Sequence, residues 1–270
     1  MYQNRIFFIG DIHGQFQWVQ AFAARLAACG QAPLDESDWI VLLGDSGLNY
    51  WTEPKRARSF KQKFTTLPCN FFIVRGNHEE RAENVTKMYP ENWNKIMIPS
   101  KCNAIQGLVF QELAYPNIYY ALDQPSVYYL KGYKTFVIPG AYSADKPYRI
   151  ANGLEWFASE QLSDAEQAMG RQIAYANQHF DFILSHTCPS EYEPTDLYLP
   201  MIDQSTVNKT TEWYLNDINH ITKSNFWLFG HYHQFRVYPI HPGDGQKIMM
   251  FNDKVLEMDN ILKGNYWETI

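Results

Sequence analysis

Five short segments carry carboxylate, amide or imidazole side chains directly after apolar, strand-like runs. In an α/β sheet, ligands bind in the loops that follow the strands, so these side chains are predicted to meet at one edge of the sheet. Glycine in four of the segments lets the backbone turn sharply. We expect each Asp-x-His or His-x-His pair to lie in extended backbone, which sends both side chains the same way. The segments are Gly10-Asp11-Ile12-His13-Gly14, Gly44-Asp45, Gly76-Asn77-His78-Glu79, Ser185-His186 and Gly230-His231-Tyr232-His233.

The donor atoms in these segments are carboxylate and amide oxygens and imidazole nitrogens, without thiolate. Such a mixed shell suits manganese, iron or zinc and excludes a closed cysteine-type zinc site, so it indicates a catalytic metal. The cysteines lie far apart without a C-x-x-C pair, which argues against a zinc ribbon or a dense disulfide framework and favours reduced thiols. They are Cys29, Cys69, Cys102 and Cys188.

Strand, loop and helix units are predicted to position the first three segments. Apolar runs at residues 5–9, 39–43 and 70–74 predict strands, and a helical pattern follows each one. Three such units in succession predict parallel strands joined by crossovers. With no linker or long-period repeat in the sequence, we expect a single domain over residues 1–270.

The rest of the chain predicts further strands and helices. Runs at residues 118–121, 126–130 and 134–139 indicate an antiparallel meander, so the sheet is expected to be mixed. Ser163 and Glu166 form a capping-box pattern at the start of a helix. Residues 81–117 are irregular, and a lid and an edge contact both stay open for them. A second helix is expected near 206–221, and strands are expected at 181–185, 226–229, 235–239 and 248–251.

Taken in order, the five segments resemble the motifs of the calcineurin-like metallophosphoesterase superfamily. They span residues 10 to 233, and five ordered pieces are far more specific than any one of them. The resemblance implies an α/β fold, a four-layer α/β/β/α sandwich with mixed sheets, and two bound metal ions bridged by Asp45. It implies that one ion is held by Asp11, His13, Asp45 and His233, and the other by Asp45, Asn77, His186 and His231.

The cofactors expected from this resemblance are two divalent or trivalent transition metal ions, with manganese first and iron, zinc or nickel as alternatives. Two cations about 3.5–4 Å apart lower the pKa of a shared water and hold the phosphate oxygens during an in-line displacement. The resemblance implies that His78 donates a proton to the leaving oxygen or stabilises the charge on it. An imidazole with an ordinary pKa of about 6.5 can do either.

No glycine precedes His186, whereas in the other four segments a glycine stands directly before the first candidate ligand. His179 and His220 compete with it, but only His186 follows an apolar strand run. His179 is expected at a helix end, where it would have a capping role.

Two arginines are candidates for binding the substrate phosphate. Arg75 completes the string Arg-Gly-Asn-His-Glu, which resembles the serine/threonine phosphatase branch, and a guanidinium can bind phosphate oxygens bidentately. A surface salt bridge is the alternative for Arg75. After Asp45 that branch places an Asp and an Arg, whereas this chain has Ser46-Gly47-Leu48-Asn49-Tyr50, which puts protein phosphatase activity in doubt. Arg149 is a candidate replacement for the lost positive charge, a surface position being its alternative, and Asn49 is a candidate for orienting His78.

Composition limits the partners. The chain has 270 residues, 46% hydrophobic content and a net charge of −6, so it has no broad basic field and extended nucleic-acid binding is not expected. No apolar run approaches the roughly 20 residues of a membrane span, and the N-terminus runs directly into a strand. These features predict a cytoplasmic location and leave the oligomeric state open.

The sequence therefore predicts a metal-dependent phosphoric ester hydrolase that acts on phosphate monoesters or diesters through a metal-bridging hydroxide. A nuclease or nucleotide phosphodiesterase of the same superfamily is the alternative enzyme, which the acidic charge disfavours. A non-catalytic, metal-stabilised binding scaffold is the weakest alternative because no ligand of the motifs is missing.

Overall fold

The computed structural model describes residues 4–98, 104–241 and 243–267. Within these ranges no helix is both long and apolar enough to cross a bilayer. Cys29, Cys69 and Cys188 are free thiols, and Cys102 lies outside the described residues.

The first part of the chain forms the predicted strand and helix units. Strand β1 pairs with β2 and β2 pairs with β3, all parallel, so their carboxyl ends lie at one edge of the sheet. This confirms the crossover pattern read from the sequence. The elements are β1 (Ile6–Ile9), α1 (Gln17–Ala28), β2 (Trp39–Leu43), α2 (Pro54–Phe64) and β3 (Asn70–Val74).

The middle of the chain differs from the predicted meander. Strand β6 pairs with β3 in parallel and with β5, whereas β7 pairs with β5 and β8. The eight-residue strand β5 therefore lies between β6 and β7, and only β7 and β8 form the expected hairpin. The elements are α3 (Ala82–Met88), η1 (Pro90–Asn92), β4 (Trp93–Ile98), β5 (Ile105–Glu112), β6 (Ile118–Ala121), β7 (Ser126–Leu130) and β8 (Tyr133–Ile138).

Strands β4 and β5 arise in the segment that the sequence left irregular, whose residues 99–103 lie outside the described ranges. In β4 only Trp93 and Ile98 are buried, so the strand lacks a regular apolar alternation. The β4–β5 pairing places β4 at an edge of the sheet, so the edge contact, one of the two alternatives left open, holds for β4, whereas β5 lies inside the sheet.

The remainder of the chain supplies the second helical layer and the last strands. Ser163 caps α5 as predicted, since its hydroxyl accepts from the Glu166 amide and its own amide donates to the Glu166 carboxylate. His179 opens β9 and bonds Asn225, so the prediction that it caps a helix is wrong. The elements are α4 (Lys146–Ala151), α5 (Asp164–Ala176), β9 (His179–Ser185), η2 (Ser190–Tyr192), η3 (Thr195–Leu197), η4 (Gln204–Thr206), α6 (Thr210–Ile221), β10 (Lys223–Phe229), β11 (Arg236–Val237), β12 (Gln246–Met249), β13 (Leu256–Glu257) and α7 (Met258–Leu262).

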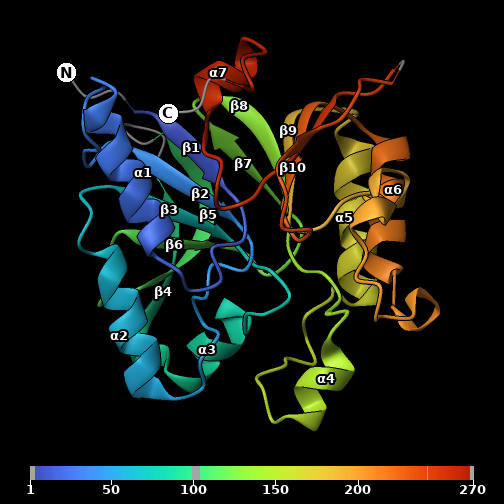
Figure 1. Cartoon of the computed structure of the whole chain (residues 1–270), viewed down its shortest axis with the longest axis horizontal. Helices are drawn as coiled ribbons and strands as arrows, with labels where there is room; N and C mark the ends of the chain where they lie inside the picture. Colours follow the sequence, from blue (N-terminus) through green and yellow to red (C-terminus); the bar gives the residue numbers. More distant parts are fainter. Residues whose placement is uncertain (1–3, 99–103, 242, 268–270) are drawn as a thin grey trace.

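Three apolar cores separate four layers, as predicted. In β1, Phe7 and Ile9 pack toward α1 and α2, while Ile6 and Phe8 pack toward the other half of the sheet. A third core lies between β8–β10 and the pair α5 and α6. Figure 1 shows α1 and α2 on one side of the strands and α5 and α6 on the other. Both faces of the central strands are therefore buried, which explains their continuous apolar runs.

The strands follow one path in the order β11-β12-β10-β9-β8-β7-β5-β6-β3-β2-β1-β13, with β4 added beside β5. Strands β8, β9 and β10 are parallel to one another, as β1, β2 and β3 are. The loops after β1, β2, β3, β9 and β10 carry the five segments singled out in the sequence.

Candidate metal centre

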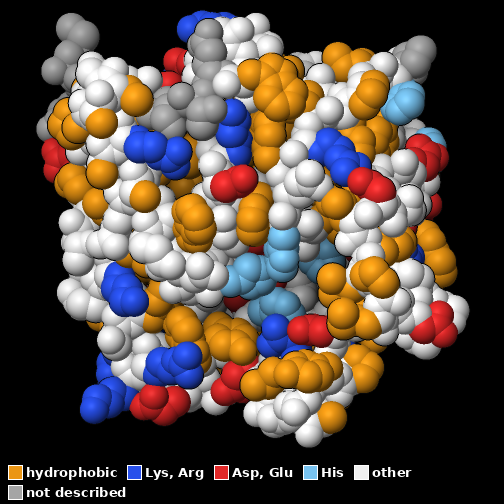
Figure 2. Space-filling view, viewed as in Figure 1, with side chains coloured by type: hydrophobic (Ala, Val, Ile, Leu, Met, Phe, Trp, Pro, Cys, Tyr) orange, Lys and Arg blue, Asp and Glu red, His pale blue; other side chains and the backbone are white. Residues whose placement is uncertain are grey.

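The five loops bring their polar side chains together around Asp45. One carboxylate oxygen of Asp45, Oδ2, lies 3.5 Å from His186 Nε2, 3.8 Å from His78 Nε2 and 3.9 Å from His13 Nδ1. Figure 2 shows histidine side chains gathered in a hollow near the middle of one face. His179 and His220 are bonded elsewhere, to Asn225 and Glu191, so His186 is the histidine of the three that reaches the centre.

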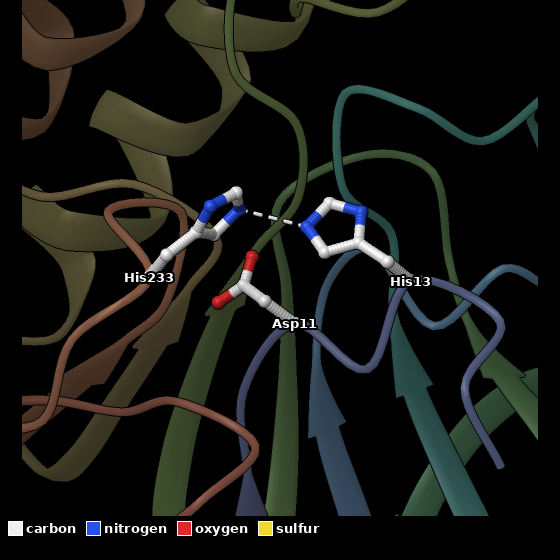
Figure 3. A group of neighbouring side chains, drawn as sticks. All are labelled: Asp11, His13 and His233. Atoms are coloured by element: carbon white, nitrogen blue, oxygen red, sulfur yellow. Dashed lines mark hydrogen bonds between the residues drawn. The ribbon is translucent and has the colours of Figure 1, made fainter. Parts of the chain in front are cut away.

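Asp11, His13 and His233 form one group in which three donor atoms lie within 4.8 Å of one another. The Nε2 atoms of the two imidazoles point toward each other and lie 2.7 Å apart, and the Asp11 carboxylate lies beside them (Figure 3). Asp11 also accepts from the His231 amide at 2.8 and 3.0 Å, which ties the loop after β1 to the loop after β10.

A second cluster beside Asp45 comprises His186, Asn77 and His231. The Nδ1–H of His186 donates to the Leu43 carbonyl at 2.8 Å, so Nε2 is the nitrogen that would bind a metal ion once its proton is displaced. His186 Nε2 is 2.8 Å from Asn77 Oδ1, and its ring lies edge-on to that of His231 with centroids 5.0 Å apart. A second group of close donor atoms comprises Asp11, Asp45 and His186.

The loop backbone differs from the expected extended form. Positive φ angles place Asp45 and both residues of the Asp-x-His and His-x-His pairs in the left-handed region. This conformation costs roughly 1–3 kcal/mol for a residue other than glycine. Such conformations persist where surrounding contacts enforce them, and they cluster at functional sites. The residues are Asp11 (34°), His13 (44°), Asp45 (46°), His231 (75°) and His233 (53°).

Two glycines of the motifs let ligand side chains pack closely. A Cβ atom on Gly44 would lie 2.0 Å from His186 Nδ1, and one on Gly76 would lie 2.1 Å from Asp45 Oδ1. The sequence indicated these glycines for turning the chain. The structure adds that they leave space for the candidate ligands of neighbouring loops.

Burial and mutual proximity set the charge of the centre. Burial lowers the pKa of His13 and His231 and lowers that of His233 to about 4, so these imidazoles are neutral at neutral pH, the form that binds metal. Burial opposes the charged form of His186 too, but the Asp45 carboxylate outweighs it and raises the pKa of His186 to about 9. Converging neutral nitrogens around a buried carboxylate fit a cation.

Residues 4–235 match the sequence model of the calcineurin-like phosphoesterases. The chain belongs to this family. A comparison with curated protein sequences found no match.

Several solved structures are similar to this phosphoesterase at low identity. A phosphopantetheinyl hydrolase from Mycobacterium tuberculosis is 13% identical, with 92% of this chain and 90% of that chain covered and a TM-score of 0.46. A dimetal phosphatase from Danio rerio is 8% identical, with coverages of 92% and 87% and a TM-score of 0.47. A protein serine/threonine phosphatase from Saccharomyces cerevisiae is 14% identical, with coverages of 94% and 72% and a TM-score of 0.36. The family assignment rests on the sequence match.

Supporting residues that were not predicted from the sequence fix the candidate ligands of this phosphoesterase. Asn77 Nδ2 donates to Ser143 Oγ at 2.9 Å, and the Ser143 hydroxyl donates to Glu160 at 2.5 Å, so the Asn77 oxygen is turned toward His186. Ser143 comes shortly after β8, just as the predicted ligands come shortly after their strands, and this position is a sequence signal that could have identified it. Glu160 lies far from any motif, so the sequence held no signal for it.

Glu79 holds two loops of the candidate metal centre together. Its carboxylate accepts from the Gly76 amide at 2.9 Å, from the Gly47 amide at 3.0 Å and from the Ser46 hydroxyl. Burial and the nearby Asp45 raise the pKa of Glu79 to about 7. This residue therefore anchors the loops after β2 and β3.

Arg149 lies at the centre, although a surface position was an open alternative. Its Nη2 is 3.2 Å from His78 Nε2, and its Nε donates to both oxygens of Asp145 at 2.9 and 3.0 Å. Burial lowers the pKa of His78, the charge of Asp45 opposes that shift, and Arg149 adds to it. Arg149 thus brings the positive charge beside His78 that the loop after β2 does not supply.

Arg75 and Asn49 are placed differently from their sequence-based roles. The Arg75 guanidinium is buried, with Nε 3.2 Å from Asp123 and Nη1 donating to the Glu160 carbonyl at 2.9 Å, and this placement favours a structural role. Asn49 Oδ1 is buried without a hydrogen-bond partner in the described part of the chain. His78 instead has Asn77, Arg149 and Asp45 as its polar neighbours.

Two differently lined cavities border Asp45 and His78. One of about 230 Å³ is polar and aromatic, and its wall includes Tyr50, Trp51, Arg56 and Arg149. The other, of about 300 Å³, extends toward residues 193–212. A phosphate at the centre could therefore carry a substituent on either side.

Proposed function

We propose that this protein is a binuclear metal-dependent phosphoesterase that hydrolyses phosphate monoesters or diesters. The single observation that carries the proposal is the convergence of seven oxygen and nitrogen donor side chains from five loops, six of them gathered around Asp45. When bound, two metal ions would make hydroxide available at neutral pH and would neutralise charge on the phosphate.

The proposed ligand sets share Asp45. Its Oδ2 atom lies within 4 Å of a nitrogen of His13, from the first set, and of a nitrogen of His186, from the second, which supports a bridging role. His231 would complete the side of His186 and Asn77, since its ring lies against that of His186. The sets are Asp11, His13, Asp45 and His233 for one ion, and Asp45, Asn77, His186 and His231 for the other.

Arg149 and His78 would act on the substrate and not on the metals. In the described geometry Arg149 donates toward His78 Nε2, so this nitrogen holds a lone pair. When a phosphate oxygen accepts the guanidinium N–H in place of His78, Nε2 would be free to take up a proton from solvent water. His78 would then pass that proton to the leaving oxygen as the phosphorus–oxygen bond breaks.

A substrate panel tests this function. The manganese-loaded protein should hydrolyse phosphate monoesters or diesters, should lose activity on chelation and should regain it with added metal. The panel should include nucleotides and single-stranded DNA and RNA, so that a nuclease would be recognised by its preference. His179→Ala is a matched control outside the centre and should keep full activity.

Absence of hydrolysis of every substrate in the panel would contradict the enzymatic proposal. If protein carrying two equivalents of manganese, iron, zinc or nickel hydrolysed no member, the metal centre would serve a binding scaffold and the enzymatic proposal would be wrong.

A further inference from the structure

We infer that the larger cavity beside the centre binds the organic part of the substrate, and that this part has an apolar body ending in a hydrogen-bond donor, best a primary amine. The inference rests on the proposed function and adds a substrate class to it. The donor would meet Glu212, a residue outside the family motifs.

The cavity is continuous with the candidate metal centre. It has a volume of about 300 Å³, and its wall includes Glu212 together with Asp45, His78, His231 and His233 of the centre. Cavities that hold small ligands begin at about this size. A phosphate bound at the metals would therefore place one substituent in it.

Much of the remaining wall is apolar, and most of it comes from the chain between β9 and α6. Figure 2 shows hydrophobic side chains beside the histidine hollow. An apolar wall stabilises an apolar substituent by roughly 25 cal/mol per Å² of surface removed from water. The lining side chains include Tyr142, Leu197, Leu199, Ile202 and Val207.

Lys209 holds this wall in place. Its ammonium group donates to both carboxylate oxygens of Glu193 at 2.9 and 3.0 Å and to the Tyr198 hydroxyl at 2.6 Å. These bonds join the residue before α6 to residues on both sides of η3, so the wall is built by specific contacts. They also occupy Lys209, whose charge is then neutralised by Glu193.

Glu212 provides the specific polar contact. Its Oε1 accepts from the Thr187 hydroxyl at 2.9 Å, while Oε2 is buried and has no hydrogen-bond partner among the residues that the structure describes. Glu212 is 4% exposed and borders the cavity. A buried carboxylate oxygen without a donor is unfavourable, so a donor on a ligand would be bound strongly there.

The charges around the cavity favour an amine over an acid. Glu193 is paired with Lys209, and Asp145 is paired with Arg149, which leaves Glu212 as the described lining carboxylate outside the metal centre that forms no salt bridge, with Lys209 acting on it only at longer range. An ammonium group would pair with Glu212, whereas a terminal carboxylate would be repelled by it. Burial raises the pKa of Glu212 to about 7, as expected for a carboxyl group that lacks such a partner.

A series of matched esters tests the inference. The probes are hexyl, aminohexyl and carboxypentyl phosphates, each as the monoester and as its methyl diester, hydrolysed by the manganese-loaded protein. The ratio of kcat/KM for the aminohexyl ester to that for the hexyl ester should be about 10 to 100, and the carboxypentyl ester should be poorest. Glu212→Gln should bring the first ratio close to one. Glu191→Gln, a change at an exposed glutamate, should leave it unaltered.

Binding of the corresponding phosphonates, measured by calorimetry, separates this inference from the proposed function. An amine preference in binding that Glu212→Gln abolishes would support the cavity assignment even if no ester were hydrolysed, in which case the proposed function alone would fail. Hydrolysis without an amine preference, or a preference that survives Glu212→Gln, would overturn the cavity assignment alone. Absence of binding by every phosphonate would overturn it as well.

Discussion

Asp45→Asn is expected to lower the affinity for both metal ions together and to reduce activity more than replacement of any other ligand. The carboxylate is central to the site, with one oxygen 3.5 Å from His186 and 3.9 Å from His13. Asparagine keeps the shape but removes the charge that holds two cations against their mutual repulsion. Because even outer-shell changes cost about 10- to 100-fold in metal affinity, we expect more than about 100-fold here.

Metal content after dialysis and turnover at limiting manganese measure this effect. Asp217→Asn is the matched control, since Asp217 pairs with Arg171 on an exposed surface. His233→Ala removes a ligand proposed for one ion alone, so it should lower the affinity for that ion more than the affinity for the other. Full metal content with near wild-type turnover in Asp45→Asn would show that Asp45 does not bridge.

His78→Ala is expected to keep both metals and to lose about 10²–10⁴ in rate, the cost of a missing positioned proton donor. The metal loop should survive because its contact to Asp45 is made by the backbone amide of residue 78, at 3.0 Å. The loss should be greatest for alkyl esters, whose leaving alkoxide is strongly basic. A p-nitrophenyl ester leaves well without a proton and should be affected less.

Comparison with Arg149→Ala identifies the role of His78. Loss of a phosphate-binding arginine should reduce the rate of hydrolysis of alkyl and aryl esters about equally, so the rate loss in Arg149→Ala should not depend on the leaving group. Equal losses on both ester types in His78→Ala would make His78 a phosphate binder as well. Loss of metal from that variant would make it a ligand.

The sequence predicted the loops of the candidate centre because the candidate ligands directly follow buried strands, and strand burial is visible as an apolar run. The pairing of β5 with both β6 and β7 was not predictable, because strand partners are set by contacts far apart in the chain. The edge strand β4 was missed because its apolar side chains do not alternate.

Within the site, the sequence indicated which side chains meet but not how they are held. The left-handed backbone at Asp11 and His13 depends on the surrounding packing and has no local pattern. The hydrogen bonds that run from Asn77 through Ser143 to Glu160 join separate loops, so they became visible only in the structure. The arginine that precedes Gly76 followed a family motif, yet its neighbour Asp123 is placed by tertiary contacts that the motif does not encode.

Titration of metal-free protein with manganese tests the central claim most directly, with bound metal and hydrolysis of bis(p-nitrophenyl) phosphate followed in the same samples. The binuclear proposal predicts that two ions bind per chain and that activity rises as the second site fills. Binding of one ion at most, with no activation by further metal, would contradict it.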